Sequence, residues 1–240
     1  VEDTVRTLEN TLNPIMVVGD RVSQSGAVDE AVRVAELLGA RVYASAFSEV
    51  TFPMTHPQFA GMVQPGTRDG RRKLSEGDAV LAVGRMSTYA QLSSEPELLL
   101  ADLDSTFIHI DTDPSEVGKI QPTDVGIIAD PKVALSEIAD ALESEMSGSA
   151  KEAAKGRIET LSVEKSAARS EWGETMCAKW DSNPMSDERM LAELSSSIPE
   201  NTVVLGDANT SRTSMNNIFQ FDTPGSFYNM RGGAIGWGLG

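Results

Sequence analysis

Residues 78–84 read DAVLAVG, and the five residues between the aspartate and the glycine are all apolar. A continuous apolar run of this length is typical of a strand that is covered on both faces, as in a parallel sheet. Helical patterns at residues 26–38, in a stretch ending near residue 76 and at 131–145 alternate with further strand candidates. The sequence therefore predicts an open, mostly parallel α/β sheet with helices on both faces, a Rossmann-like domain. The other expected strands are residues 15–19, 41–45, 106–111 and 125–129.

Residues 148–185 have a different composition. They are charged, with sparse apolar positions, which predicts an exposed helical connector after a linker-like stretch at residues 147–150. Ser186 has the chemistry of a helix N-cap, and a strand is expected at residues 202–206. One strand, a turn and a glycine-rich segment are too few to close a sheet. We expect a first α/β domain, a helical linker and an incomplete second α/β unit, at residues 1–147, 148–185 and 186–240.

The chain is strongly acidic. Its 240 residues include 36 Asp and Glu against 20 Lys and Arg, a formal net charge of −16. Nucleic acids and anionic lipid surfaces bind clustered basic residues, so neither is an expected partner. No apolar run approaches the roughly 18 residues of a membrane-spanning helix, and residues 1–10 lack a secretory pattern, so we expect a cytoplasmic protein. One cysteine and two histidines exclude a structural zinc site.

Three loops after expected strands have polar chemistry. Gly19–Gly26 joins a strand to a helix, where backbone amides could meet a phosphate, but the spacing is not GxGxxG and a tight turn is favoured. Arg85 follows a strand and could hold a phosphate or form an ion pair. Asp113 precedes Pro114, a pattern that favours a helix N-cap over ribose binding.

The histidines and the cysteine give no catalytic arrangement. His109 lies inside an apolar strand and is expected to be a core residue, whereas His56 lies in a loop rich in proline and aromatic residues and is expected to be structural. Cys177, on the exposed connector, is interpreted as having no role in function. The strongest chemical signal is at the end of the chain, where the glycine-rich residues 225–240 follow small polar residues at 206–211. Glycines at this density allow a ligand to approach the backbone closely.

The order of these motifs resembles that in thiamine-diphosphate-dependent enzymes of the benzoylformate decarboxylase and acetolactate synthase group. In that family a pyrimidine-binding domain, a central α/β domain and a diphosphate-binding domain follow one another. The chain is similar to the central domain, the linker and the opening of the diphosphate-binding domain. The residues that carry the resemblance are 13–19, 52–61, 78–84, 109–114 and 232–240.

The resemblance implies a cofactor site. It assigns diphosphate contacts to Asn209, Thr210 and Ser211, a backbone carbonyl for the aminopyrimidine to Gly233, and the aliphatic wedge that bends the cofactor to Ile235. No catalytic residue and no metal ligand is assigned. The family's activating glutamate belongs to the preceding domain, and its magnesium motif would lie beyond residue 240, so the 240 residues alone are expected to be inactive.

The resemblance also implies the function of the complete protein. We expect a thiamine-diphosphate- and Mg²⁺-dependent decarboxylase or carboligase of a small-molecule 2-oxo acid, similar to benzoylformate decarboxylase, working as a homodimer or homotetramer. Two departures bear on this. Gln91, or Ala90 after a shift of one residue, takes the place of the catalytic histidine of benzoylformate decarboxylase, and Asn209 replaces a hydroxyl residue.

Two alternatives stay open. The first is an enzyme similar to acetolactate synthase that binds FAD through the central domain. Such enzymes carry a Gly-Ala-Arg stretch there, and Arg85 matches it only in part. The second is a non-catalytic nucleotide-binding or scaffolding α/β module.

The charge also makes a prediction about stability. A large acidic excess repels itself at low ionic strength and is screened in concentrated salt, which is typical of proteins from salt-loving hosts, although an ordinary acidic enzyme is the alternative. We expect the melting temperature of the chain to rise substantially between low and molar KCl, measured by circular dichroism. A flat profile would contradict the salt-adapted interpretation.

Overall fold

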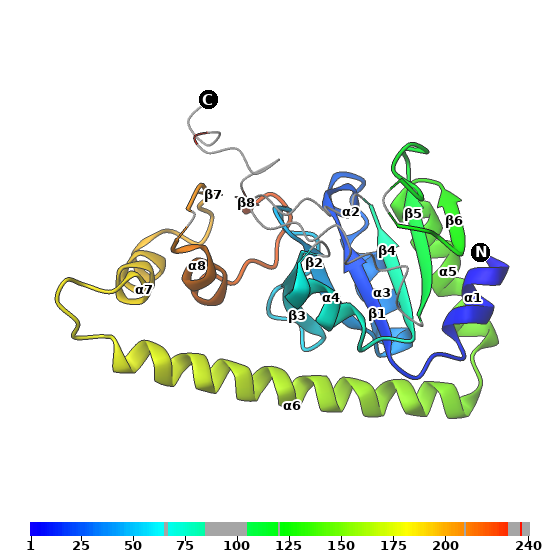
Figure 1. Ribbon diagram of the computed structural model, residues 1–240, viewed down its shortest axis with the longest axis horizontal. Helices are drawn as coiled ribbons and strands as arrows, with labels where there is room; N and C mark the ends of the chain where they lie inside the picture. Colours follow the sequence, from blue (N-terminus) through cyan, green and yellow to red (C-terminus); the bar gives the residue numbers. More distant parts are fainter. Residues whose placement is uncertain (65–66, 85–104, 120, 209, 230–235, 237–240) are drawn as a thin grey trace.

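The first 147 residues form a six-stranded parallel sheet with the strand order β3-β2-β1-β4-β5-β6 (Figure 1). The computed structural model describes all residues except 65–66, 85–104, 120, 209, 230–235 and 237–240. The α/β fold predicted from the apolar runs is confirmed. The strands are β1 (Pro14–Val18), β2 (Arg41–Ser45), β3 (Phe59–Val63), β4 (Ala79–Val83), β5 (Thr106–Asp111) and β6 (Val125–Ile128).

The two faces of the sheet are covered by different helices. Alternate residues of β1 point to opposite faces, so Met16 and Val18 join one apolar cluster while Ile15 and Val17 join another. The first cluster packs beneath α1 (Glu2–Leu8), α3 (Val28–Leu38) and α5 (Pro131–Glu145). The second packs against Leu74 of α4 (Arg68–Leu74). Helices therefore lie on both faces, as the sequence predicts.

Several local expectations are wrong. The turn expected at residues 19–26 contains a short helix, α2 (Asp20–Gln24), because Val22 is buried and anchors a turn of helix there. Residues 147–150, expected to be a linker-like stretch, begin a helix instead: the Ser147 hydroxyl accepts a hydrogen bond from the Ala150 N–H and caps that helix. The loop after β2 includes the edge strand β3, and the N-terminal helix α1 was not predicted.

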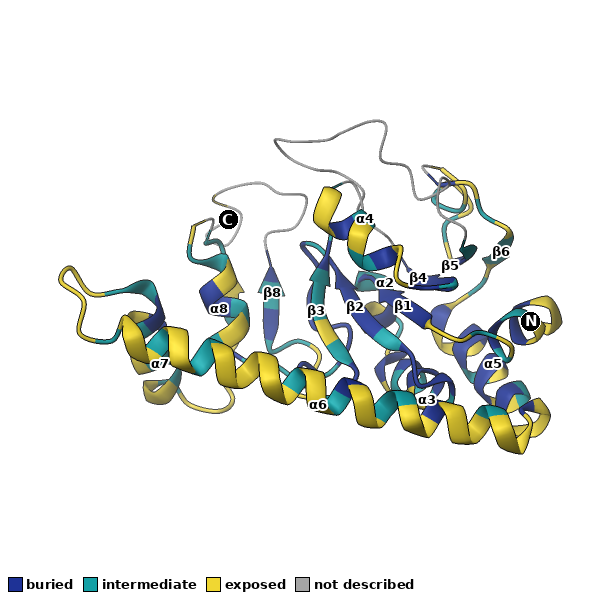
Figure 2. Ribbon diagram, turned by 60° about the horizontal axis from the view of Figure 1, so that its bottom comes forward, coloured by how far each residue is buried: buried dark blue, intermediate teal, exposed yellow. Residues whose placement is uncertain are grey.

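A single long helix, α6 (Gly148–Ala178), runs along one side of the molecule from α5 to the second unit (Figure 1). Most of its residues are exposed (Figure 2), as expected for a connector. Ala154 and Leu161 are buried, and the Arg157 guanidinium donates to the Leu38 carbonyl, with Nη2 2.6 Å from the oxygen. These contacts fix α6 against the C-terminal end of α3.

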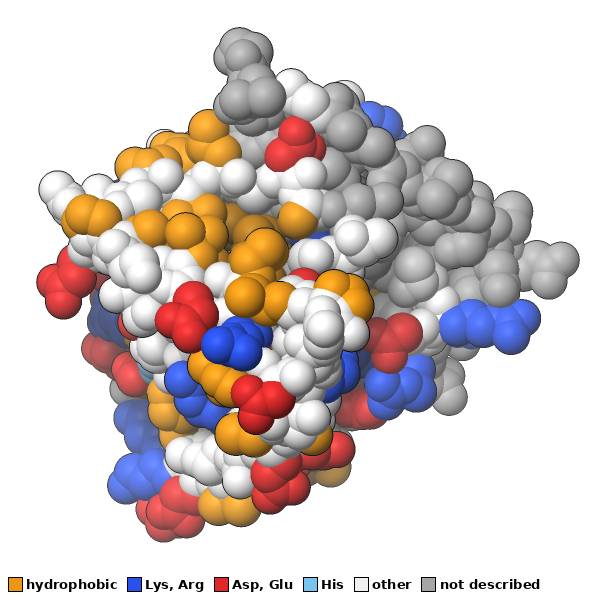
Figure 3. Space-filling view, turned by 90° about the vertical axis from the view of Figure 1, so that its left-hand side faces the viewer, with side chains coloured by type: hydrophobic (Ala, Val, Ile, Leu, Met, Phe, Trp, Pro, Cys, Tyr) orange, Lys and Arg blue, Asp and Glu red, His pale blue; other side chains and the backbone are white. Residues whose placement is uncertain are grey.

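The second unit packs against the first domain through an apolar cluster that is separate from the two clusters of the sheet. It consists of α7 (Asp187–Ser197), β7 (Val204–Gly206), α8 (Arg212–Ile218) and β8 (Phe227–Asn229), with β7 and β8 paired in parallel. Val50 and Met54, from the loop after β2, pack in one cluster with its apolar residues. Apolar side chains are exposed at the far end of this unit (Figure 3). They include Met185, Met190, Leu194, Val203 and Leu205.

Of the helices in the described ranges, none combines the length and the apolar composition needed to span a bilayer.

The contact between α3 and α6 depends on a glycine. Gly39 ends α3 in the left-handed region at φ 61°, and a Cβ there would lie 2.4 Å from the Ala154 carbonyl oxygen. Gly26 has a similar φ of 65° with nothing within 4 Å of a Cβ, so it is a matched control. We expect Gly26→Ala to cost about 1 kcal/mol of backbone strain. Gly39→Ala should cost about 1–3 kcal/mol more because α6 must shift. Urea unfolding measures both, and equal losses would show that the helix contact contributes nothing.

Candidate functional site

The strand order reverses between β1 and β4, and in open α/β sheets ligands bind outside the carboxyl ends of the strands at such a point. Gly19 follows β1 and Gly84 follows β4. Their backbones are tied to the neighbouring strands, since the Gly19 N–H donates to the Val83 carbonyl at 2.8 Å. Gly84 has a φ of 76°, and a Cβ there would meet the Arg21 Cβ at 3.1 Å. Arg21 therefore lies directly over the reversal point.

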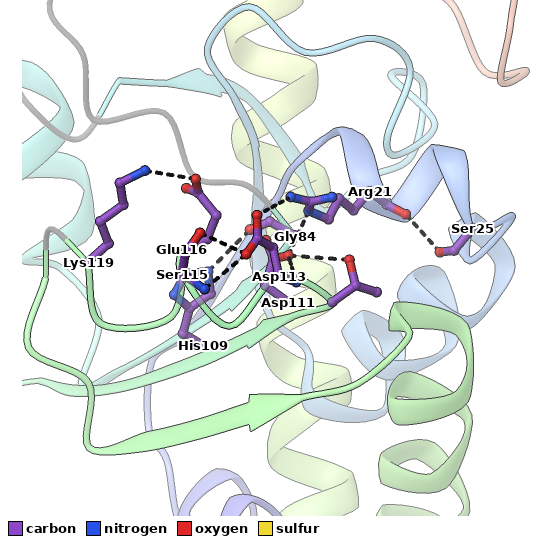
Figure 4. A network of polar contacts seen from close by, with 10 residues as sticks. Arg21, Ser25, Gly84, His109, Asp111, Asp113, Ser115, Glu116 and Lys119 are labelled. Atoms are coloured by element: carbon purple, nitrogen blue, oxygen red, sulfur yellow. Dashed lines mark hydrogen bonds and ion pairs between the residues drawn. The ribbon is translucent and has the colours of Figure 1, made fainter.

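Arg21 is held there by two carboxylates (Figure 4). Its Nε lies 2.6 Å from Oδ1 of Asp111 at the end of β5, and its Nη2 lies 3.6 Å from Oδ2 of Asp113. The Asp113 carboxylate also accepts hydrogen bonds from the hydroxyl and the N–H of Ser115, and these bonds lower the pKa of Asp113. This arrangement corrects the sequence prediction, because Asp113 closes a turn and does not cap a helix.

Asp111 is completely buried, and among the described residues its Oδ2 has no hydrogen-bond partner. A buried carboxylate oxygen without a donor is costly, so a ligand hydroxyl or amine would be favoured beside it. A phosphate would not be, since Asp111 and Asp113 together outweigh the single charge of Arg21. The phosphate interpretation of Gly19–Gly26 thus gains no support from the described side chains, and Arg85 lies outside them.

The histidines and the cysteine have the environments that the sequence predicts. His109 is 5% exposed, with its Nε2 3.3 Å from the Gly84 carbonyl oxygen, and burial lowers its pKa. His56 packs edge-on against Phe52, with its Nε2 3.4 Å from a carboxylate oxygen of Glu36. Cys177 is exposed.

The cofactor residues implied by the resemblance are only partly within the described structure. Thr210 and Ser211 lie between β7 and α8, and the Ser211 hydroxyl does not cap that helix. Asn209, Gly233 and Ile235 lie outside the described residues, and so do Ala90, Gln91 and Trp237.

Asp207 is a site residue that sequence reasoning missed. It is the first residue after β7, and its Oδ2 accepts a hydrogen bond of 2.8 Å from the N–H of Gly236. Its Oδ1 is buried without a partner among the described residues. This bond joins the turn after β7 to the glycine-rich end of the chain. The available signal was an acidic residue directly after a short strand.

Lys165, in the middle of α6, was also missed. Its ammonium donates to the carbonyl oxygens of Met54, His56 and Phe59 at 2.6, 2.8 and 3.1 Å. Burial lowers the pKa of Lys165 to about 8. The sequence could not distinguish it from the exposed lysines of the same helix.

Within the ranges that the structure describes, no three His, Cys, Asp or Glu side chains are grouped so that they could hold a metal ion.

Known proteins of similar sequence match nearly the whole chain. Residues 1–138 match the family model of the thiamine pyrophosphate enzyme, central domain. The "Probable acetolactate synthase large subunit" of Methanococcus aeolicus is 26% identical over 256 residues, which cover 100% of this chain and 40% of that protein. The sulfoacetaldehyde acetyltransferase of Castellaniella defragrans is 26% identical over 254 residues, 99% of this chain and 41% of the relative.

Solved structures agree at the level of the fold. The benzoylformate decarboxylase of Polynucleobacter necessarius matches with a TM-score of 0.73 and 17% identity, covering 98% of this chain and 40% of that one. The chain thus spans about 40% of the length of the relatives that it matches.

The burial of His109 predicts a pH dependence. Its pKa is lowered below 6.5 in the folded protein, so below about pH 6.5 the unfolded chain binds a proton that the folded protein does not. The free energy of unfolding should therefore fall as the pH drops, with His109 adding up to about 1.4 kcal/mol per pH unit. Urea unfolding between about pH 7 and 5 should show a shallower loss for His109→Gln than for the control His56→Gln. Identical slopes for the two variants would contradict this assignment.

Proposed function

The chain belongs to the thiamine pyrophosphate enzyme family through its central domain, and from this premise we propose that the complete protein is a thiamine-diphosphate- and Mg²⁺-dependent enzyme acting on a small 2-oxo acid. The proposed reaction is decarboxylation or carboligation of the benzoylformate decarboxylase type. The proposed working form is a cytoplasmic homodimer or homotetramer. Because the chain spans about 40% of its relatives, the activity is proposed for the complete protein.

The observation that carries the proposal is the hydrogen bond from the Gly236 N–H to the Asp207 carboxylate. The resemblance assigns cofactor contacts to both segments that this bond joins, the turn after β7 and the glycine-rich end. Gly206 supports the same arrangement, since a Cβ there would lie 2.8 Å from the Met215 Cε and 2.9 Å from Phe227. The glycine thus lets α8 and β8 approach the end of β7.

The residues at this turn have chemistry that fits a diphosphate. Thr210 is exposed, and the Ser211 hydroxyl is not used to cap α8, so both can donate to phosphate oxygens. We assign the aminopyrimidine to the carbonyl of Gly233 and the bend of the cofactor to the side chain of Ile235. When bound, thiamine diphosphate supplies an electron sink for the carbanion of a 2-oxo acid. No catalytic residue or metal ligand is assigned within the described residues.

The names of the relatives favour a reaction that forms or breaks a carbon–carbon bond, but they do not identify the substrate. Two related sequences are named for a synthase and an acetyltransferase, and a protein of similar fold is a decarboxylase. The proposal therefore keeps both reaction types.

A calorimetric titration tests the cofactor assignment. The complete protein should bind thiamine diphosphate saturably in the presence of Mg²⁺, and the double variant Thr210→Ala, Ser211→Ala should bind it about tenfold or more weakly, because hydrogen bonds to a charged group are lost. Ser196→Ala, on the exposed part of α7, is the matched control and should bind normally. No heat of binding to the unaltered protein would overturn the proposal.

A second candidate function is favoured by Oδ2 of Asp111 at the strand-order reversal, which has no hydrogen-bond partner among the residues that the structure describes. That oxygen could accept a hydroxyl of FAD or of an adenine nucleotide, as in an enzyme similar to acetolactate synthase or in a non-catalytic nucleotide-binding module. In the same calorimeter, saturable binding of FAD or ADP that is lost in Asp111→Ala would favour this candidate. Binding of thiamine diphosphate without either ligand would favour the first.

A further inference from the structure

A groove of about 700 Å³ lies between β3, α6 and α8, outside the sites described so far. Its walls also include residues of α4 and residues at both ends of β2. The volume is within the range of about 300–1,000 Å³ that is common for small-molecule sites. We call it the β3–α6–α8 groove.

The groove is basic although the chain is acidic. Five basic side chains line it against two acidic ones, in a protein with a net charge of −16. The acidic pair is Asp69 and Glu164, and the basic side chains are Arg41, Lys73, Lys165, Arg169 and Arg212. A concave surface of one sign raises the local concentration of ligands of the opposite sign.

Both acidic side chains are already in ion pairs with basic side chains of the groove. Glu164 lies 2.8 Å from a guanidinium nitrogen of Arg41, and Asp69 lies 2.8 Å from the Lys73 ammonium. The Lys165 ammonium is held by three backbone carbonyls, and among the described residues no carboxylate forms an ion pair with it.

The two remaining guanidiniums also line the groove. Among the described residues, neither Arg169 on α6 nor Arg212 on α8 has a carboxylate within 4.0 Å. The Arg212 guanidinium instead lies over the ring of Phe47, 5.1 Å from its centroid. Phe47 has a φ of 64°, a strained value for a residue with a side chain, and such strain is typical of functional positions.

Two uncharged polar side chains at the groove also have atoms without a hydrogen-bond partner among the described residues. Trp172 and Asn216 both line the groove, and the Trp172 Nε1 and the Asn216 Oδ1 are buried with no hydrogen-bond partner within the described part of the chain. An indole N–H can only donate, and a buried donor without an acceptor is costly. A ligand with acceptor oxygens would remove that cost.

The edge of β3 is not arranged to add a peptide strand. The Phe59 carbonyl is occupied by Lys165, and the Met62 sulfur is contacted by Asn216 at 3.5 Å. Gly61 has a φ of 97°, and the register with β2 shifts near it. An irregular edge with a charged side chain on it disfavours strand pairing. A small molecule is therefore the better occupant.

We propose that the β3–α6–α8 groove binds a small organic phosphate, with its phosphoryl group between Arg169 and Arg212 and the Trp172 N–H as a further donor. A phosphate monoester carries a charge of about −1.5 to −2 at pH 7, which matches two uncompensated guanidiniums. Guanidiniums also suit the planar, paired hydrogen bonding of phosphate oxygens.

The fluorescence of Trp172 can be used to measure ligand binding in the groove. In the variant Trp180→Phe, Trp237→Phe it is the one tryptophan left of three. Ribose 5-phosphate should change its fluorescence saturably, and inorganic phosphate should compete. Arg169→Gln should weaken the response about tenfold. Lys155→Gln, an exposed cation elsewhere on α6, should leave it unchanged.

Calorimetric titration of the unaltered chain with ribose 5-phosphate is the control for a folding defect in the tryptophan variant. Absence of saturable binding in that titration, or equal binding by Arg169→Gln, would overturn the proposal. Loss of binding in Thr210→Ala, Ser211→Ala would also overturn it, because the phosphate would then sit at the proposed cofactor residues. Binding that survives this double variant and is lost in Arg169→Gln supports the groove, whatever the outcome with thiamine diphosphate.

Discussion

The two central strands, β1 and β4, are buried at every residue, and the architecture follows from the need to cover both of their faces. No single helix can do so, which is why α3 and α5 pack on one face while α4 packs on the other. Each parallel strand then requires a crossover, and all strands end at the same edge of the sheet. The buried carboxylate of Asp111 and the guanidinium of Arg21 meet at that edge because this packing aligns β5, which ends at Asp111, with β1, which precedes Arg21 of α2.

Basic side chains hold the elements of this acidic protein together. Arg33 of α3 bridges two carboxylates of α5, Asp140 and Glu143, at 2.8 and 2.7 Å. Arg157 and Lys165 of α6 bind backbone carbonyls of the first domain rather than carboxylates. A guanidinium or ammonium can satisfy several acceptors at once, so a few cations can fix a long helix against the sheet. Within the described residues, the β3–α6–α8 groove is where the guanidiniums of Arg169 and Arg212 have no carboxylate partner.

The sequence predicted those elements whose signals are local. The strand at residues 106–111 and the helix at 131–145 have the observed bounds, the latter because Asp130 caps it and Pro131 starts it. Strand β3 was missed because it lies at the sheet edge, where only Val63 of its five residues is buried, and because Gly61 interrupts its short apolar stretch. The contacts of Lys165 join residues more than 100 positions apart, and no local pattern encodes them. The assignment of Thr210 and Ser211 to the cofactor rests on family resemblance and stays a prediction.

The long helix α6 imposes a rule on how the linker can change in length. Ala154 sits against Gly39, and Lys165, 11 residues later, binds the loop before β3. Eleven residues make about three helical turns, so both side chains share one face. Inserting one residue between them would rotate Lys165 by about 100° and advance it by about 1.5 Å, away from its three carbonyls. A one-residue change in the linker therefore turns Lys165 off the face that meets the first domain, whereas a change of seven residues, about two turns, keeps it on that face but about 10.5 Å farther along the helix axis.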